Sequence, residues 1–555
     1  MVLERVIETD VLVVGGGIAG VFAAIKAKEQ GLDVTLVDKG HIGKTGSTAF
    51  AGMNFTVFNP EMGSDFDLNM KRINEDSEYL NDREWSEIIM KESWSIYEAC
   101  ASWGVEFPIE EEKEGTFFKI YPPFLQARIK RRQVAPPLRR QALKCGIRIM
   151  DRIMLTELLK KDGRVVGATG FPMSSLDYLY IFKAKAIALC SGGWALRNST
   201  GDNQEATGDG QAMAFRAGAE LTGGESHASQ AHSGDYHSWK GARAARSVFR
   251  YYEDALGARI AHGYESDTTI EMTFHNGRGP IYHNLDPATP EDMERMWKRQ
   301  QNSDARESRR VDYDPRNGGK YLLSGGGGGG IGASIWPVDK MCATIIPGLY
   351  AGGSTCGTRG NWWGGLPSCG VTGRRAGQGA AEYALQAENP IIDEEELARA
   401  KETLYAPAER KSGFNPRWVT QLLQNTMVPY YVLIVQHADR LQAALTMIEF
   451  FRDHYVPKLL ANDSHELRLA HETRNMTLGC EIALRSSLFR TESRGAHYRE
   501  DYPRRDDPTW LAWIKMREED GKIKLWKEPV PEEWWPDLSK PYEERYPKRF
   551  PGEIP

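Results

Sequence analysis

The chain has 555 residues, of which 41% are hydrophobic and 26% are charged, and its formal net charge is −6. Because this length exceeds a single hydrophobic core, we expect two to four domains. The acidic balance excludes nucleic acid as a partner, since nucleic-acid binding needs a clustered cationic surface. No run approaches the ~18 apolar residues that cross a bilayer, and the N-terminus is no signal peptide, so the sequence predicts no transmembrane segment and a cytoplasmic location.

The N-terminal segment has the pattern of a strand, a glycine turn, a helix and a second strand. Val11–Val14 is an apolar run that suits a buried parallel strand. The helical stretch Val21–Gln30 and a second strand, Val34–Val37, follow it. Between the first strand and the helix lies the G-x-G-x-x-G motif of Gly15, Gly17 and Gly20. All parts of a dinucleotide-binding unit therefore occur in order.

Each glycine of this motif has a physical reason to be there. Gly15 permits the tight turn, Gly17 lets the backbone approach a pyrophosphate, and Gly20 allows the helix to pack closely on the strand. The helix N-terminus supplies amide donors for the phosphates. Asp38, at the end of the second strand, is placed to accept hydrogen bonds from a ribose. The unit predicts dinucleotide binding without distinguishing FAD from NAD.

Five later blocks resemble the succinate dehydrogenase/fumarate reductase flavoprotein family, which includes L-aspartate oxidase and the adenylylsulfate reductase alpha subunit. The blocks are GKTGSTAFAGMN (43–54), AKAIALCSGGWALRN (184–198), ATGDGQAMAFRAGAEL (206–221), IIPGLYAGG (345–353) and RTESRGAHYREDYPRRDD (490–507). They occur in the order of the family and span almost the whole chain. The resemblance implies that the cofactor is FAD.

The resemblance also implies which residues hold the FAD. Besides the glycine motif and Asp38, they are Lys39, Ser47, Thr48, Gly52, Met53, Ser191, Gly192, Asp209, Gly353 and Ser368. For Asp209 a plain helix N-cap is the alternative, and for Ser47 and Thr48 a simple turn. Membrane-bound members attach FAD through a histidine at the place that Ser47 occupies here. A hydroxyl cannot form that bond, so we expect non-covalent FAD.

The fold implied by pattern and resemblance is an α/β FAD-binding, doubly wound (Rossmann-like) domain with an inserted α+β capping domain and a C-terminal helical domain. The FAD-binding domain comprises residues 1–240 and 341–395, and the capping domain comprises 241–340. Apolar residues at helical spacing predict the helical domain over 396–490. Residues 491–555 form a C-terminal tail rich in Pro, Trp and charge. Docking of its tryptophans onto the body of the chain is favoured over docking onto a partner.

The chain departs from the family at the residues that grip a dicarboxylate. Counting back from Gly277–Gly279 places the capping-domain arginine of the family at Gly263, and the family's histidine falls near Gly325 in a glycine run. Where dicarboxylate-binding members carry arginine, this chain carries Trp362, followed by Trp363. Loss of the bidentate guanidinium argues against a fumarate reductase or a succinate dehydrogenase.

The altered pocket predicts a larger and less charged substrate, sandwiched over the flavin by Trp362 or Trp363. Packing of these indoles against the flavin domain, away from substrate, is an equally weighted alternative. Hydride transfer at one carbon still needs proton exchange at its neighbour. The candidates for that role are His262, Arg259, Arg359, Tyr282 and His232. No metal site is predicted, because the histidines of the 227–237 segment are spaced by five residues.

The seven cysteines are scattered singly, without a CxxC pair, so the sequence predicts neither a zinc site nor an iron–sulfur cluster. We therefore expect an FAD-dependent oxidoreductase that acts on a C–C bond beside an electron-withdrawing group of a small-molecule substrate. It would exchange electrons with a separate redox partner, for which an iron–sulfur protein is a candidate. The alternatives are a flavoprotein resembling adenylylsulfate reductase that acts on a sulfur substrate, and a non-catalytic FAD electron relay.

Overall fold

The computed structural model describes residues 2–50, 55–107, 117–118, 123–127, 129, 133–197, 206–228, 249, 251–260, 272–273, 276–302, 314–323, 330–360 and 365–553. At its centre lies a seven-stranded sheet in the order β6-β2-β1-β9-β8-β7, with β19 also paired to β9. The strands are β1 (Leu3–Val14), β2 (Val34–Asp38), β6 (Arg148–Asp151), β7 (Ile153–Lys161), β8 (Arg164–Pro172), β9 (Tyr178–Leu189) and β19 (Leu349–Ala351). β1 is longer than the apolar run that predicted it, because its first half pairs with β9 while remaining exposed.

The parallel part of the sheet brings several strand ends to one edge. β1 is parallel to β2 and β9, and β19 is parallel to β9. In this register Val14 lies opposite both Val37 and Leu189, and Leu189 lies opposite Ala351. The loops that follow these four strands therefore emerge together, which is where ligands bind in open parallel sheets.

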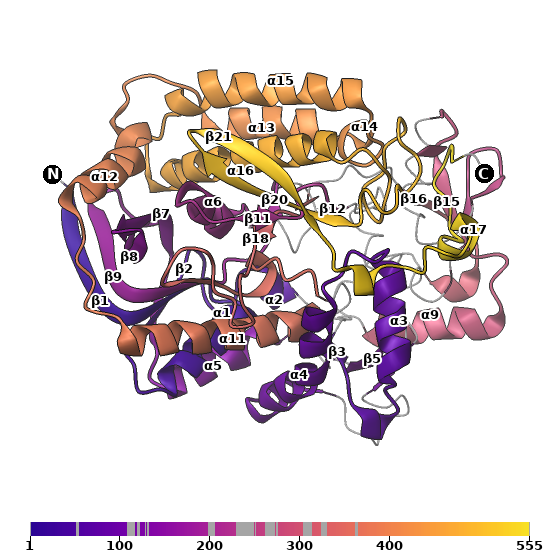
Figure 1. Cartoon of the computed structure of the whole chain (residues 1–555), viewed down its shortest axis with the longest axis horizontal. Coiled ribbons are helices and arrows are strands. Elements are labelled where there is room, and N and C mark those ends of the chain that lie inside the picture. The colour runs from indigo at the N-terminus through magenta and orange to yellow at the C-terminus, as the bar shows by residue number, and fades with distance from the viewer. Residues whose placement is uncertain are drawn as a thin grey trace.

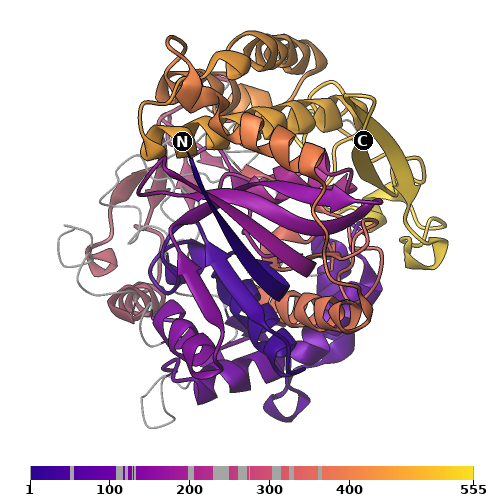
Figure 2. The same cartoon turned by 90° about the vertical axis from the view of Figure 1, so that its left-hand side faces the viewer.

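Helices cover both faces of the sheet (Figures 1 and 2). One face carries α1 (Ile18–Lys28), α4 (Arg83–Ser102), α5 (Ala135–Lys144) and α11 (Gly365–Gln386). The other face carries α6 (Asp209–Arg216) and α12 (Glu394–Glu409). α11 crosses α1 at very short range, since a Cβ on Gly373 would lie 2.2 Å from the carbonyl oxygen of Ala19. The predicted doubly wound class is confirmed.

A second, antiparallel sheet lies at the far end of the molecule from the long strands (Figure 1). Its order is β14-β13-β15-β16. The strands are β13 (Tyr252–Glu253), β14 (Arg259–Ile260), β15 (Ile281–Asn284) and β16 (Lys320–Leu323), with α9 (Pro290–Asn302) alongside. This sheet and helix correspond to the predicted α+β capping part, and the domain boundaries given above remain predictions.

The predicted helical region is a layer of helices over the sheet (Figure 2). Besides α12 it contains α13 (Pro416–Met427), α14 (Tyr430–Leu433), α15 (Ala438–His454) and α16 (Ser464–Phe489). α12 and α16 begin at aspartates, Asp393 and Asp463, whose carboxylates accept amide hydrogen bonds from the first turn. α16 is buried on nearly every side, so it forms the centre of this layer.

The C-terminal tail returns to the body of the chain. Its hairpin, β20 (Ala512–Glu519) and β21 (Lys522–Pro529), extends a sheet that contains β11 (Leu221–Thr222) and β18 (Ser334–Ile335). Trp510 and Trp513 are 3% and 5% exposed. These two tryptophans therefore pack onto the body, which is the interpretation that the sequence favoured.

Candidate active site

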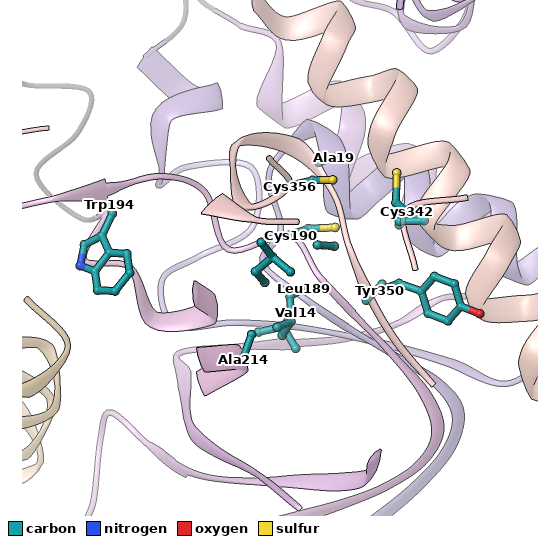
Figure 3. Packing of buried hydrophobic residues seen from close by; sticks show 14 of the residues in the cluster. Val14, Ala19, Leu189, Cys190, Trp194, Ala214, Cys342, Tyr350 and Cys356 are labelled. Atoms are coloured by element: carbon teal, nitrogen blue, oxygen red, sulfur yellow. The ribbon is translucent and has the colours of Figure 1, made fainter. Parts of the chain in front are cut away.

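The glycine turn after β1 is shaped by close backbone contacts. Gly15 has a φ of +104°, and a Cβ on it would lie 2.3 Å from the carbonyl oxygen of Cys190. A Cβ on Gly20 would lie 1.8 Å from the carbonyl oxygen of Gly15. Figure 3 shows Val14, Leu189 and Cys190 converging at this point. Only glycine fits at Gly15 and Gly20, which agrees with the roles predicted for them.

The N-terminus of α1 has the features of a phosphate cradle. Its N-cap, Gly17, has no side chain to cap the helix, and the first turn holds no acidic residue. The hydroxyl of Thr48, which lies in α2 (Ser47–Phe50), accepts a hydrogen bond of 3.1 Å from the amide of Ile18. By contrast, Asp82 caps α4 with its own carboxylate. A glycine-capped helix end without an acidic first turn suits the pyrophosphate of a dinucleotide.

Asp38 lies beside this turn at the end of β2. Its carboxylate accepts hydrogen bonds of 2.6 Å from the amides of both Gly16 and Gly40. Burial raises the pKa of Asp38 above its ordinary value, although the two amide bonds act in the opposite direction. The carboxylate is therefore held at the strand end where the sequence motif places a ribose-binding acid, so the residues present fit a dinucleotide.

Lys39 occupies the centre of a buried network of charges. Its Nζ lies 2.7 Å from Asp209 Oδ2, 3.0 Å from Glu472 Oε1 and 2.8 Å from Thr207 Oγ1. Asp209 also accepts a hydrogen bond of 2.9 Å from Asn475 Nδ2. Asp209 is the first residue of α6, whose N-cap is Gly208, so the N-cap alternative for Asp209 does not hold. The network joins the ends of β2 and α6 to the buried helix α16.

The electrostatics of this network are balanced. Burial would lower the pKa of Lys39, but Asp209 and Glu472 raise it above its ordinary value. Burial opposes ionisation of Asp209, yet Lys39 and its other hydrogen-bond donors hold its pKa below the usual range. Glu472 also pairs with Arg197, so each charge has a close partner. The hydrogen bonds of Lys39 Nζ are therefore all made within the protein, and direct binding of a cofactor by Lys39 and Asp209 remains a prediction.

Glu472 and Asn475 were missed by sequence reasoning. Both are buried residues of α16, a helix whose apolar spacing predicted an ordinary core helix. The available signal was the run of consecutive polar residues from His471 to Asn475, which interrupts the apolar spacing of this helix. Buried polar residues need partners, which here come from the strand ends.

The remaining described FAD candidates lie around the ends of β9 and β19. Ser191 Oγ accepts the amide of Gly210 at 3.1 Å, and the amide of Gly192 donates to Thr355 Oγ1 at 3.0 Å. Gly353 adopts a φ of +66°, and a Cβ on it would lie 2.8 Å from the Cβ of Ala19 in α1. Ser368 is half-buried, and its hydroxyl donates to a carbonyl of its own helix. Thr355 was not predicted, although it joins two of these loops.

Arg359 lies in the loop that precedes the two predicted pocket tryptophans. Its backbone is left-handed, with a φ of +57°, and its carbonyl accepts a 3.0 Å hydrogen bond from the amide of Asp82. Its side chain is 16% exposed, and its Nη2 lies 3.9 Å from Glu225 Oε1. This separation is an ion pair beyond hydrogen-bond range.

The surroundings of Arg359 leave it weakly neutralised. Glu225 Oε1 is shared with Arg490 at 3.5 Å, and Glu225 Oε2 is buried without a hydrogen-bond partner among the described residues. Burial lowers the pKa of Arg359, Glu225 opposes that effect, and the charge of Arg490 adds to it. A largely buried and weakly paired guanidinium is suited to hold an anionic or carbonyl group of a ligand.

Arg259 and Tyr282 lie together in the capping sheet. Both stand opposite Glu253 in the ladder, so they share one face of that sheet. The Arg259 guanidinium stacks 4.8 Å from the ring of Tyr251. Among the described residues, the ion pair of Arg359 is made with Glu225, not with Arg259 or Tyr282. The predicted site residues His232, His262, Gly52, Met53, Trp362 and Trp363 lie outside the described residues.

The described residues contain neither a candidate metal-binding group nor a helix suited to span a membrane. No group of three or more His, Cys, Asp or Glu residues there has an arrangement that could hold a metal ion. None of the helices described combines the length and apolar character needed to span a bilayer.

Comparisons with known proteins place this geometry among flavoproteins. A model of the FAD binding domain matches residues 10–246, and a model of the fumarate reductase flavoprotein C-terminus matches residues 420–546. An uncharacterised FAD-dependent oxidoreductase of Methanocaldococcus jannaschii is 27% identical, over 94% of this chain and 98% of that protein. One of the subunits of the CoM/CoB fumarate reductase of Methanothermobacter marburgensis is also 27% identical, over 92% and 97%.

A solved structure extends the comparison to the whole fold. Adenylylsulfate reductase of Archaeoglobus fulgidus superposes with a TM-score of 0.79 at 22% identity, over 96% of this chain and 97% of that one. The two chains therefore share the fold over nearly their whole length.

Proposed function

Because the chain belongs to the FAD-binding succinate dehydrogenase/fumarate reductase flavoprotein family, we propose that it transfers hydride between FAD and a C–C bond of a bulky, non-dicarboxylate substrate. The bond lies beside an electron-withdrawing group. The chain is an FAD-dependent oxidoreductase of this family, and the chemistry of its substrate is the proposal.

The proposal rests on the sequence of residues 357–365 and on the surroundings of Arg359. Trp362 stands where dicarboxylate-binding members carry arginine, so the fork for a second carboxylate is missing. Arg359, three residues earlier, keeps a largely buried guanidinium that lies 3.9 Å from the carboxylate of Glu225. A weakly paired cation and two indoles match a substrate with one polarised group and a large apolar body.

Different residues of the chain would bind the cofactor, bind the substrate and exchange the proton. FAD, when bound, supplies the hydride donor or acceptor. The turn at Gly15 and Gly17, with Asp38, would hold its adenosine diphosphate part. Arg359 would bind the electron-withdrawing group and stabilise the charge that develops on it. Proton exchange at the neighbouring carbon would fall to Tyr282 or Arg259 of the capping sheet, or to His262 or His232.

We propose that the FAD is held without a covalent bond. Ser47 occupies the position at which some members carry the linking histidine, and its hydroxyl cannot form a histidyl bond. Acid precipitation of the purified enzyme tests this claim. Yellow FAD is expected in the supernatant, and a yellow protein pellet would contradict it.

Electrons would be exchanged with a separate protein. The relative from Methanothermobacter marburgensis is one of the subunits of its enzyme, and it matches this chain over nearly all of its length. The cysteines of this chain occur singly, without cluster-binding spacing. We therefore propose that the partner is an iron–sulfur electron-transfer subunit, with co-purification from the native source as the direct check.

The decisive assay is anaerobic reoxidation of the photoreduced enzyme. Bulky α,β-unsaturated acids and enones should reoxidise the flavin, because Arg359 can polarise their carbonyl group. Bleaching of the oxidised flavin by sulfite plus AMP, without reoxidation by any enoate, would overturn the proposal in favour of sulfur chemistry. Exchange with a ferredoxin alone would instead favour an electron relay.

A further inference from the structure

Three arginines from three elements of the chain gather at the outer end of the network that holds Lys39. Arg417 is the second residue of α13 and Arg468 lies near the start of α16, and these two helices pack against one another in the helical layer (Figure 1). Arg197 follows the short strand β10 (Trp194–Ala195). Arg417 and Arg468 both contact His465, whereas Arg197 and Arg468 both pair with the carboxylate of Glu472. The three guanidinium groups are therefore linked into one cluster.

The imidazole of His465 lies between two of these guanidinium groups. Arg417 Nη2 lies 3.0 Å from His465 Nε2, and Arg468 Nη2 lies 3.3 Å from His465 Nδ1. A guanidinium only donates hydrogen bonds, and a neutral imidazole has one nitrogen that accepts and one that donates. Partial burial lowers the pKa of His465, and the charges of Arg468 and Arg417 lower it further, which favours the neutral ring. One of the two contacts therefore sets two N–H donors against each other without an acceptor.

Arg468 has a further donor that is not used. The residue is only 9% exposed, and its Nε is buried without a hydrogen-bond partner among the described residues. Its Nη1 lies 3.4 Å from Glu472 Oε1, which is a long hydrogen bond. Buried donors are normally satisfied, because an unmade hydrogen bond costs free energy. This guanidinium is therefore arranged for an acceptor that the described residues do not supply.

Positive charge exceeds negative charge at this end of the network. Lys39 and Arg197 are matched by two carboxylates, one of which belongs to Glu472. Arg468 adds a third cation, and in the described part of the chain the carboxylate that it pairs with is this same Glu472. Glu472 is fully buried and carries one charge for three cations. Its negative charge is therefore already used within the Lys39 network.

Arg417 increases the excess. Its side chain is exposed, and among the described residues the side-chain partner of its guanidinium is the imidazole of His465 rather than a carboxylate. The two acids in the first turn of α16 have other partners, since Asp463 accepts the amide of Glu466 and Glu466 accepts two hydrogen bonds from Asn462. Arg417 and Arg468 thus add two positive charges to a balanced network, on a side that is open to solvent.

We propose that Arg197, Arg417 and Arg468 bind a dianionic phosphoryl group, either inorganic phosphate or the terminal phosphate of a small metabolite. Two negative charges match the excess of two positive charges. The tetrahedral oxygens accept hydrogen bonds from several guanidinium groups at once, which is the recognition that arginine provides best. A phosphate oxygen also supplies the acceptor that is missing where a guanidinium faces the N–H of His465. The site uses none of the residues assigned above to FAD or to the substrate.

Isothermal titration calorimetry of the FAD-loaded enzyme tests this site, because bound FAD fills the pyrophosphate cradle. Inorganic phosphate and a monoester, phenyl phosphate, are titrated separately at an ionic strength held constant with potassium chloride. At least one of them should bind at one site per chain with a Kd below about 1 mM. Tighter binding of inorganic phosphate would identify free phosphate as the ligand, and tighter binding of the monoester would identify a phosphorylated metabolite. Absence of saturable binding by both would overturn the proposal.

Variants locate the bound phosphate. Arg417→Gln and Arg468→Gln each remove one charged donor, so the Kd should rise at least about tenfold. Arg399→Gln is the matched control, because Arg399 is an exposed arginine of α12 that already pairs with Glu396 at 2.9 Å, and its Kd should stay within about twofold of wild type. Arg417 is exposed, so its variant keeps the test valid even if Arg468→Gln fails to fold. An unchanged Kd in Arg417→Gln, or an equal rise in Arg399→Gln, would contradict the site.

Arginine modification maps the same site in the wild-type enzyme. The FAD-loaded protein is treated with phenylglyoxal, with and without the phosphate compound that binds, and the modified peptides are quantified by mass spectrometry. At about ten times the Kd, the ligand should slow modification of Arg417 roughly tenfold and leave Arg399 unaffected. Equal rates at Arg417 with and without ligand would overturn the proposal. Neither the calorimetry nor this mapping depends on turnover of a substrate.

Discussion

Lys39 and Arg359 are both largely buried cations at the candidate site, with side chains 20% and 16% exposed, yet the structure partners them in opposite ways. Lys39 makes three hydrogen bonds of 2.7–3.0 Å, to Thr207, Asp209 and Glu472. Arg359 has a carboxylate oxygen of Glu225 at 3.9 Å, which is an ion pair without a hydrogen bond. A cation whose donors are all used holds the protein together, whereas a weakly paired one is available to a ligand. We therefore expect Lys39 to contribute mainly to the stability of the fold and Arg359 mainly to ligand binding.

The largest effect on stability is expected when the charge of Lys39 is removed. Lys39→Met leaves Asp209 and Glu472 buried with reduced compensation, and we expect the free energy of unfolding to fall by about 3 kcal/mol. Lys401→Met is the matched control, because its ion pair with Glu4 is exposed and should be worth less than about 1 kcal/mol. Chemical denaturation followed by circular dichroism measures both. Equal effects of the two substitutions would contradict the distinction.

The pH dependence of the same variant sharpens this prediction. The pKa of Asp209 is lowered from 3.8, so its contribution to stability is fully present above pH 3.8 and is lost as pH falls through the folded-state value. The pKa of Lys39 is raised from 10.5, so its contribution is present below pH 10.5 and is lost at higher pH. The difference between wild type and Lys39→Met should therefore stay constant from about pH 5 to 9 and narrow below pH 3.8. A difference that widens on acidification would point to another cause.

Substitution of Arg359 should lower activity much more than stability. Arg359→Met removes a charged donor to the substrate, so kcat/KM should fall roughly 10- to 100-fold, as expected for a hydrogen bond of about 1.5–3 kcal/mol. The free energy of unfolding should fall less than for Lys39→Met, because the 3.9 Å pair with Glu225 makes no hydrogen bond and Glu225 keeps Arg490. Arg359→Lys retains the charge and should recover part of the activity. Unchanged kinetics together with a large loss of stability would mean that Arg359 stabilises the fold and does not bind the substrate.

A smaller effect is expected at the phosphate cradle. Thr48→Val removes the hydroxyl that accepts the amide of Ile18 at 3.1 Å, and FAD should bind roughly five-fold more weakly, for a loss of about 1 kcal/mol. Ser368→Ala is the control with the smallest effect, since its hydroxyl bonds within its own helix. Fluorescence titration of the FAD-free protein measures both affinities. A larger loss for Ser368→Ala than for Thr48→Val would reverse this assignment.

The fold was largely predictable, because the information lies in local patterns. The apolar run Val11–Val14, the glycine motif and the helical spacing of residues 396–490 each follow from short-range chemistry. The partners of the site residues were not predictable in the same way. Glu472 reaches Lys39 from 433 positions away, and no local pattern encodes that contact. The distinction between Lys39 and Arg359 depends on such distant partners, so it required the structure.

At the candidate substrate site, the sequence and the structure give complementary information. The exchange of arginine for Trp362 is visible in the sequence, but it says only what the pocket has lost. The structure adds what remains, namely the weakly paired guanidinium of Arg359 near Glu225. Together they lead to the proposal of a substrate with one polar group and a large apolar body.

The most direct test of this account is a competition for the photoreduced flavin under anaerobic conditions. Fumarate is offered against a bulky α,β-unsaturated acid or enone with one carbonyl group, and the rate of flavin reoxidation is followed by absorbance. The account predicts that the bulky compound reoxidises the flavin and that fumarate does so at least about tenfold more slowly, in keeping with the loss of about 1.4 kcal/mol or more from an absent arginine contact. Faster reoxidation by fumarate would contradict it.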